Sequence, residues 1–415
     1  MSLMSDSAQA RFGLARLIDP IPQQEFEEEY LDRKPLYISR SDDEYYAELL
    51  TFDDLDRLLT LSGPGFDNVR VVSGSADTYF AGNDARRHEA ANRLESIYRN
   101  YRAGSTLVLN SVNERFEPLK HLEHALHSEL NAGFEMNVYL TPGGQEQGFK
   151  PHYDTHDVFV LQVYGTKKWQ LYGRPFPMPL PMPAQEFHAL GASLNIPAEP
   201  ERELVMQPGD LLYLPRGTVH AATSNDTATA HLTIGMHRPL WFPLIQDALF
   251  ELAAKDARLR AALPPGFNRS PEALEQTVEQ LRELLGSVLV GLRPERIVNG
   301  AAARTTFITS PNLRGHLSDL EQVSSVTADT VFYRREGMRF NLAVAGPLIQ
   351  LEFHNKTVKL PVEIAPVVQF LATADPKGFT VADFPAGLAV NARLEIARTL
   401  LHEGFLTLSA PETLH

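Results

Sequence analysis

The segment from Phe134 to Tyr172 constrains the fold most, because its apolar residues recur with a period of two at its start. Two sets of side chains alternate there: Phe134, Met136, Val138 and Leu140 on one face, and Glu135, Asn137 and Tyr139 on the other. Successive side chains of a β-strand point to opposite faces, so this pattern predicts a strand with an apolar and a polar face.

Turn signals divide the following segment into short strands at regular intervals. They are Pro142-Gly143-Gly144, Gly165-Thr166, Pro208-Gly209-Asp210, Pro215-Arg216-Gly217 and Asn225-Asp226. Short antiparallel strands separated by such turns are typical of a sandwich or barrel. The middle of the chain is therefore predicted to be a β-barrel.

The flanking segments are more helical. The pattern from Phe26 to about Leu61 predicts a helix, a short strand and a helix. After Pro239 the apolar residues follow helical spacing, and Ser270-Pro271 supplies a cap and a first turn for one helix. The last segment predicts helices and a terminal strand, as in a small winged-helix-like domain. We expect a catalytic barrel with N-terminal helices at residues 1–240, a helical region at 241–326 and the winged-helix-like domain at 327–415.

Composition narrows the class of protein. The net charge of −14 disfavours nucleic acid and anionic membranes and favours a basic partner. The chain has no cysteine, so any metal must be bound by His, Asp or Glu. The first twenty residues lack a long apolar segment, and no later segment approaches a membrane span. We therefore expect a cytoplasmic protein without a membrane partner.

Three residues are candidates for a metal site. His152 and Asp154 lie two apart, which on a strand would direct an imidazole and a carboxylate to the same side. His220 follows the turn Pro215-Arg216-Gly217 on a neighbouring predicted strand. Two His and one carboxylate leave three positions of an octahedral metal open, which suits Fe(II) that must bind a cosubstrate and O₂. His156 is a rival ligand, because its strand parity matches that of Asp154.

An oxygenase of this kind also needs a cation inside the barrel, to hold the distal carboxylate of 2-oxoglutarate. Lys167 and Lys168 follow the turn at Gly165 and are the candidates, although a Lys-Lys pair at a hairpin is often only a solvated turn. Asn137, Tyr139 and Thr233 lie on polar strand faces. They are expected either to line the same cavity or to face solvent.

These residues carry a resemblance to the JmjC-type ribosomal oxygenases of the cupin superfamily. The matching segments span roughly residues 25–240 and are Arg33-Lys34-Pro35-Leu36, Asn137 to Pro142, His152-Tyr153-Asp154, Phe159 to Gln162, Gly165-x-Lys167-x-Trp169, Pro208 to Gly217 with His220, and His231-Leu232-Thr233. The resemblance implies an α+β fold: a double-stranded β-helix (jelly-roll, cupin) barrel of JmjC type, a helical dimerisation region and a C-terminal winged-helix-like domain.

The resemblance also assigns roles. It implies that His152, Asp154 and His220 bind Fe(II), with no catalytic residue beyond these ligands, and that Lys167 rather than Lys168 holds 2-oxoglutarate. Asn137 would lie beside the cosubstrate and Tyr139 near the substrate, with Thr233 a further candidate at the cosubstrate. The family hydroxylates an arginine or histidine of a ribosomal protein and forms homodimers. An extra residue in the loop from Gly143 to Lys150 is a departure at the expected mouth of the barrel.

Three alternatives remain open from the sequence. A winged helix often binds DNA, but the segment from Lys356 onward has five basic against six acidic residues, a poor footprint for DNA. The chain could instead be a non-catalytic metal-binding cupin. Within the oxygenases, it could hydroxylate a small molecule rather than a protein.

Overall fold

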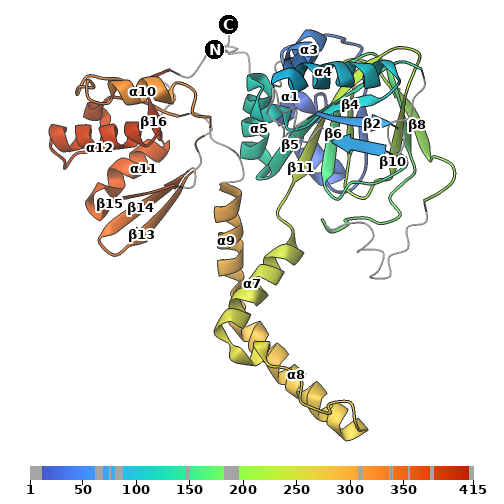
Figure 1. The fold of residues 1–415 in the computed structure, drawn as a ribbon. Helices are drawn as coiled ribbons and strands as arrows, with labels where there is room; N and C mark the ends of the chain where they lie inside the picture. The colour runs from blue at the N-terminus through green and yellow to red at the C-terminus, as the bar shows by residue number, and fades with distance from the viewer. Residues whose placement is uncertain are drawn as a thin grey trace, which may run out of the picture.

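Two antiparallel sheets form the body of the protein (Figure 1). The computed structural model describes residues 12–60, 69–73, 76–79, 87–144, 150–181, 196–306, 312–335, 338, 340–353, 356–373 and 378–410. The larger sheet has the strand order β1-β9-β6-β11-β5-β4-β2-β3, and the smaller sheet has the order β10-β7-β8. Every pair of neighbouring strands in both sheets is antiparallel. The predicted succession of short antiparallel strands is confirmed.

The strands of the larger sheet are β1 (Leu36–Ile38), β2 (Val69–Ser73), β3 (Ala76–Tyr79), β4 (Thr106–Leu109), β5 (Gly133–Thr141), β6 (Asp157–Tyr164), β9 (Leu211–Leu214) and β11 (Thr229–His237). Those of the smaller sheet are β7 (Lys167–Leu171), β8 (Arg202–Met206) and β10 (His220–Ser224). The loop from Gly143 to Lys150, in which the sequence indicates an extra residue, consists largely of residues 145–149, which lie outside the described residues.

Alternation along β6 divides its apolar side chains between two cores. Phe159 and Leu161 belong to the core between the larger sheet and the N-terminal helices. Val158 and Val160 face the smaller sheet and pack with residues such as Trp169. On β5 the same alternation buries the predicted apolar face and turns the polar face toward the space between the sheets. The polar lining of that space therefore follows from the period-two pattern.

Helices from the N-terminal part cover the outer face of the larger sheet. They are α1 (Leu14–Leu17), α2 (Gln23–Glu25), the π-helix Phe26–Tyr30, α3 (Phe52–Thr60), α4 (Arg87–Arg102), the 3-10 helix Val112–Glu114 and α5 (Glu117–Leu130). Leu14, Phe26 and Leu122 are fully or almost fully buried in the core beneath them. The predicted order of helix, strand and helix between Phe26 and Leu61 is found as the π-helix, β1 and α3.

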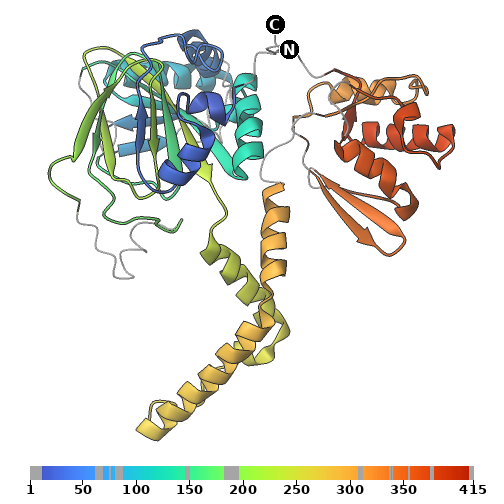
Figure 2. The same ribbon diagram turned by 180° about the vertical axis from the view of Figure 1, so that it is seen from behind.

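An arm of helices leaves the barrel after β11, and both views show it extending away from the sheets (Figures 1 and 2). It consists of α7 (Trp241–Lys255), the 3-10 helix Ala257–Arg260, α8 (Pro271–Gly291) and α9 (Pro294–Thr306). As predicted, Ser270 caps α8: its hydroxyl accepts a hydrogen bond from the Ala273 N–H at 3.2 Å, and Pro271 opens the first turn. No helix in the described ranges is long and apolar enough to cross a membrane.

A smaller C-terminal lobe has a core of its own. Its elements are α10 (His316–Gln322), β12 (Tyr333–Arg334), β13 (Asn341–Ala345), β14 (Leu348–Phe353), β15 (Lys356–Pro361), the 3-10 helix Val362–Ile364, α11 (Ala365–Thr373), the 3-10 helix Val381–Asp383, α12 (Val390–His402) and β16 (Leu406–Thr407). A buried ion pair of 2.6 Å between Arg335 and Asp319 ties α10 to this lobe. The terminal strand predicted from the sequence is β16, which pairs with β12.

Candidate metal centre

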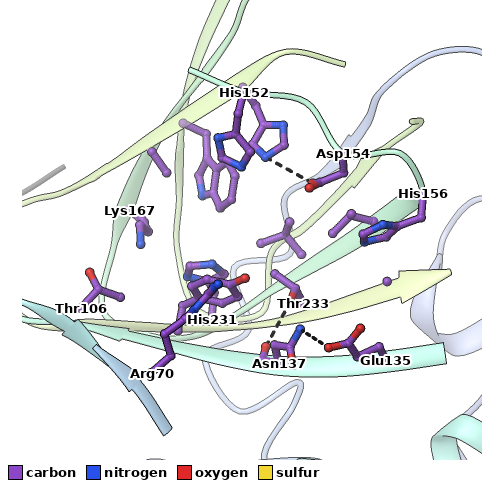
Figure 3. Close-up of a pocket in the computed structure, with 17 residues that line it drawn as sticks. Arg70, Thr106, Glu135, Asn137, His152, Asp154, His156, Lys167, His231 and Thr233 are labelled. Carbon is purple, nitrogen blue, oxygen red and sulfur yellow. Dashed lines mark hydrogen bonds and ion pairs between the residues drawn. The ribbon is translucent and has the colours of Figure 1, made fainter. Parts of the chain in front are cut away.

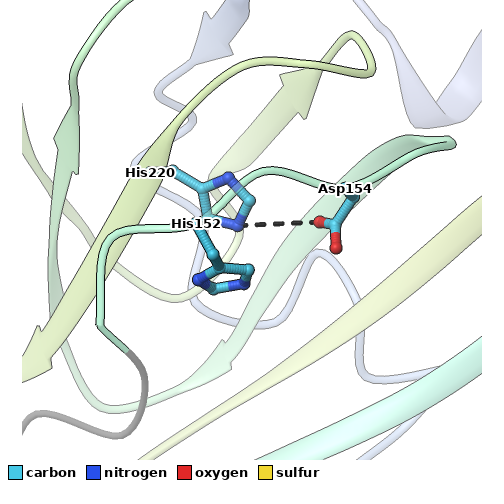
Figure 4. A group of neighbouring side chains, drawn as sticks. All are labelled: His152, Asp154 and His220. Carbon is cyan, nitrogen blue, oxygen red and sulfur yellow. Dashed lines mark ion pairs between the residues drawn. The ribbon is translucent and has the colours of Figure 1, made fainter. Parts of the chain in front are cut away.

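His152, Asp154 and His220 converge at one point between the two sheets (Figure 4). One ligand atom from each residue lies within 4.8 Å of the others. His220 Nε2 is 3.7 Å from Asp154 Oδ2. Among the described residues, these three form the one group of His and carboxylate side chains close enough to share a metal ion.

Backbone hydrogen bonds hold the three residues together. The N–H of His152 donates to the carbonyl of His220 at 3.1 Å, and the N–H of His220 donates back to the carbonyl of His152 at 2.8 Å. The Gly217 N–H donates to the carbonyl of Asp154 at 2.9 Å. Gly217 has a φ of +84°, and a Cβ there would lie 2.3 Å from the carbonyl oxygen of Phe176, so this turn requires glycine.

The expectation that His152 and Asp154 share a strand is wrong. Both lie in the loop before β6, where His152 forms an isolated bridge with His220 and Asp154 has no strand partner. The two side chains converge because the loop is fixed by hydrogen bonds to the segment of His220, not because of strand parity.

Both imidazole rings are oriented for metal binding. His152 Nδ1 is 2.8 Å from the carbonyl oxygen of Lys150, and His220 Nδ1 is 3.0 Å from that of Thr218. A carbonyl can only accept, so each Nδ1 carries the proton and each Nε2 keeps its lone pair. Burial lowers the pKa of His220, which keeps that ring neutral. Two neutral imidazoles and one carboxylate fit a divalent metal such as Fe(II).

His156, the rival ligand, does not join this group. Its ring lies against that of His237, with ring centroids 4.5 Å apart. It lines the same pocket at a different place.

A network of charged side chains supports the two loops that carry the ligands. Asp32 forms ion pairs with Arg174, Arg216 and Arg238 at 3.1 to 3.3 Å. Asp157 accepts hydrogen bonds from the Arg216 N–H at 2.8 Å and from Arg238 at 2.9 Å. Burial raises the pKa of Asp157 although Arg238 opposes this shift. Asp157 lies three residues after Asp154, and Arg216 four before His220, so the network fixes both loops.

A cavity of about 300 Å³ opens beside the three metal-binding candidates (Figure 3). Its lining includes Asn137, Tyr139, Lys167 and Thr233, all of which the sequence had singled out. Lys168 points elsewhere and pairs with Glu203 at 2.9 Å. The two neighbouring lysines therefore have different surroundings, as alternation along β7 requires.

Lys167 is buried and has no ion-pair partner in the part of the chain that the structure describes. Its Nζ donates to the hydroxyl of Thr141 at 3.1 Å. Burial lowers the pKa of the Lys167 ammonium to about 7. A buried cation without a counterion is unfavourable, so this end of the cavity attracts an anion.

The polar residues of β5 and β11 are connected by hydrogen bonds. Asn137 Oδ1 accepts from the Ser111 N–H at 2.9 Å, and Asn137 Nδ2 donates to Glu135 Oε1 at 3.2 Å. The Thr233 hydroxyl donates to the carbonyl of Asn137 at 3.2 Å. The side-chain amide of Asn137 therefore forms hydrogen bonds with the Glu135 carboxylate and with the backbone N–H of Ser111.

The sequence analysis assigned no role to several residues that line the cavity. His231 stacks on Tyr139 with ring centroids 4.9 Å apart, and burial lowers its pKa well below the ordinary value. Arg70 on β2 and Glu135 on β5 also line the cavity. The polar face of β5 was a signal for Glu135, whereas Arg70 comes from a strand that the period-two pattern did not reveal.

Comparison with known proteins gives concordant results. Residues 111–244 match the JmjC domain family. The chain is 31% identical to ribosomal oxygenase 2 of Mus musculus over 261 residues, which are 60% of this chain and 53% of that protein. It is 28% identical to the bifunctional lysine-specific demethylase and histidyl-hydroxylase NO66 of Dictyostelium discoideum over 382 residues, 86% of this chain and 72% of that protein.

Among solved structures, the ribosomal oxygenase YcfD of Escherichia coli is 17% identical with a TM-score of 0.49, covering 93% of this chain and 98% of that one. The chain spans about half the length of the ribosomal oxygenase 2 proteins that it matches. The resemblance found in the sequence is confirmed: residues 111–244 match the JmjC domain family, and the proteins similar to this chain include ribosomal oxygenases.

Proposed function

We propose that this protein is an Fe(II)- and 2-oxoglutarate-dependent oxygenase that hydroxylates an arginine or histidine side chain of a ribosomal protein. One observation carries the proposal: two metal-ready imidazoles and a carboxylate share a cavity with a buried lysine that has no counterion among the described residues. The names of the relatives, ribosomal oxygenase and histidyl-hydroxylase, support the reaction and the class of substrate.

His152, Asp154 and His220 would hold the metal. Their Nδ1 hydrogen bonds and the paired backbone of His152 and His220 fix the donors before the metal arrives. When bound, Fe(II) supplies the redox chemistry by which O₂ and 2-oxoglutarate oxidise a C–H bond. No side chain has to act as a general base for this reaction.

Lys167 would hold the distal carboxylate of 2-oxoglutarate. Its ammonium lies at a closed end of the cavity, where Thr106 and Thr141 place hydroxyls 3.0 Å apart. A carboxylate bound there would favour the protonated form of Lys167 and accept a charge-assisted hydrogen bond from its ammonium. Asn137 and Thr233 would line the cosubstrate's side of the cavity, and Tyr139, held flat against His231, would lie near the substrate. Trp169, Val158 and Val160 close the apolar wall and exclude water.

The net charge of −14 supports a basic protein substrate rather than DNA or a membrane surface. The absence of cysteine from the sequence is compatible with the reducing cytoplasm, where we propose that the protein acts. A small molecule is the alternative substrate.

The exposed apolar surface of the helical arm is the observation that supports a homodimer. Its helices expose a large set of apolar side chains: Trp241, Phe242, Ile245, Leu249, Phe250, Leu274, Val278, Leu281, Leu285, Leu289, Val290 and Val298. Soluble monomers rarely expose so large an apolar surface, so a second copy of the arm is the proposed cover. The C-terminal lobe, with its helices and the sheet β13-β14-β15, is proposed to be a winged-helix-like domain that docks substrate or supports the structure.

The metal site makes the first prediction. His220→Ala should weaken binding of Mn(II), used as a redox-stable probe for Fe(II), by about 100-fold or more, because one of three donors is lost. Isothermal titration calorimetry measures the change. His402→Ala removes an exposed imidazole on α12 and should bind Mn(II) like the wild type. Equal affinities of the wild type and His220→Ala would contradict the assignment.

The two adjacent lysines allow a matched test of activity. Succinate is measured with Fe(II), ascorbate and 2-oxoglutarate, with ribosomal proteins added or withheld. Lys167→Ala should raise the KM for 2-oxoglutarate by about 100-fold, because a buried charge-assisted contact is lost. Lys168→Ala, which removes the same charge outside the cavity, should behave like the wild type.

The outcomes of this assay separate the alternatives. Turnover that requires His152 and increases with ribosomal proteins supports a protein hydroxylase. A wild-type protein that binds metal but forms no succinate in any condition would instead be a non-catalytic cupin.

Cosubstrate binding should depend on pH through Lys167. The pKa of Lys167, about 7, must rise when a carboxylate binds beside it, so binding takes up a proton above pH 7. Affinity for 2-oxoglutarate should be nearly constant below pH 7 and fall by up to about 100-fold between pH 7 and pH 9. Neighbouring His231 stays neutral over this range because burial lowers its pKa.

Calorimetry of the Mn(II)-loaded protein in buffers of different ionisation enthalpy measures this proton uptake directly. Lys167→Arg, whose guanidinium remains charged, should lose most of the pH dependence. Identical pH profiles for the wild type and Lys167→Arg would show that another group is responsible.

The arm makes a prediction about assembly. The double variant Leu285→Asp and Leu289→Asp places two charges on one exposed face of α8, and it should shift the protein from twice the chain mass to the chain mass in light scattering after size exclusion. Val390→Asp, on an exposed apolar residue of α12, is the control and should leave the mass unchanged. A monomeric wild-type protein would refute the proposed dimer.

A further inference from the structure

The cavity has a second charged end, opposite Lys167. Figure 3 shows Lys167 and Thr106 at one end, and Glu135 and His156 at the other. Along β5, exposure increases from the half-buried Tyr139 and Asn137 to the exposed Glu135. Glu135 therefore lies at the rim, where a substrate side chain would enter.

The carboxylate of Glu135 is held in place but not neutralised. Asn137 Nδ2 donates to Glu135 Oε1 at 3.2 Å, and the same amide is anchored by the Ser111 N–H at 2.9 Å. No ion pair to Glu135 exists among the residues that the structure describes. An amide is a neutral partner, so the negative charge of Glu135 remains available to a ligand.

A flat aromatic surface lies beside Glu135 at the rim. Gly235 is the cross-strand partner of Glu135, and a Cβ at Gly235 would lie 2.9 Å from the ring of His156. The missing side chain thus lets the His156 ring lie over β11, where it packs against the ring of His237. Burial lowers the pKa of His237, so this neighbouring imidazole is not a permanent counterion for Glu135. Asp154, the other acidic group of the cavity, is committed to the metal site.

The cavity therefore has opposite charges at its two ends. A dianionic cosubstrate is attracted to Lys167, whereas an anionic group at the rim would be repelled by Glu135. A carboxylate accepts two parallel hydrogen bonds from a guanidinium, which is planar and always charged, whereas a neutral imidazole offers one donor and no charge.

We propose that Glu135 determines substrate specificity by accepting hydrogen bonds from the guanidinium of an arginine side chain that enters the cavity beside the imidazole pair of His156 and His237. This inference rests on the proposed function and deepens it: the substrate residue is arginine rather than histidine. Asn137 acts through Glu135 as a positioning residue, because its amide fixes the carboxylate.

The test compares two probes of the same shape, Nα-acetyl-arginine amide and Nα-acetyl-citrulline amide, of which the second has no charge. Binding to the full-length protein is followed by the fluorescence of Trp169, which lines the cavity, in a Trp241→Phe background that removes the second of the two tryptophans. The Mn(II)- and 2-oxoglutarate-loaded protein should bind the arginine probe at least about tenfold more tightly than the citrulline probe.

Glu135→Gln should reduce this preference to about one while leaving citrulline binding unchanged, and Glu135→Asp should retain part of it. Glu114→Gln removes the same charge at an exposed position that does not line the cavity, and it should keep the preference. A wild-type protein without preference for the arginine probe, or a preference that survives Glu135→Gln, overturns the proposal.

Succinate formation by the same preparations, with ribosomal proteins added, reports separately on the proposed function. Turnover without arginine preference would support the oxygenase function and contradict the proposed role of Glu135. Arginine preference without turnover would support the guanidinium site and contradict the oxygenase function.

Discussion

The reciprocal pair of backbone hydrogen bonds between His152 and His220 is the constraint on which the site depends. It joins the loop before β6 to the start of β10, and so connects the larger sheet to the smaller one at the metal centre. Each of the two histidines also donates from Nδ1 to a carbonyl two residues earlier in the chain. The same short segments therefore fix the backbone, the tautomer and the direction of both Nε2 atoms, so hydrogen bonds within the protein orient the donors.

The charges of the cavity follow from which strands form its walls. β7 contributes Lys167 on its buried face, which the larger sheet covers, whereas its neighbour Lys168 reaches the surface and pairs with Glu203. β5 contributes a row of polar side chains that ends at the rim with Glu135. A buried ammonium without a counterion among the described residues makes the closed end receptive to an anion, whereas the rim carries the carboxylate of Glu135. The order of the strands thus separates the two charges along one cavity.

Local sequence patterns predicted much of this site, because strand alternation and tight turns depend on residues that are neighbours in the sequence. The alternation in β5 placed Asn137 and Tyr139 on a polar face, and the turn before His220 required Gly217. The choice between Lys167 and Lys168 was not local, since it depends on which face of β7 the larger sheet covers. The loop position of Asp154 was also beyond the sequence, because its backbone partner Gly217 lies on another part of the barrel.

The charge network around Asp32 shows why local sequence patterns do not reveal ion pairs between residues that are far apart in the chain. Asp32 and Arg216 are 184 residues apart, and neither has a neighbour that suggests the other. Asp32 adopts a φ of +58°, which is uncommon for a residue other than glycine, and the Tyr213 hydroxyl accepts a hydrogen bond from its N–H at 2.8 Å. Arg238, which shares Asp32 and Asp157, belongs to the segment that leads from β11 into α7. The N-terminal segment, the two ligand loops and the base of the arm therefore meet at one carboxylate. Arg238 pairs with Asp157, three residues from a metal-binding candidate, so one charge network contacts both the base of the arm and the loop that carries Asp154.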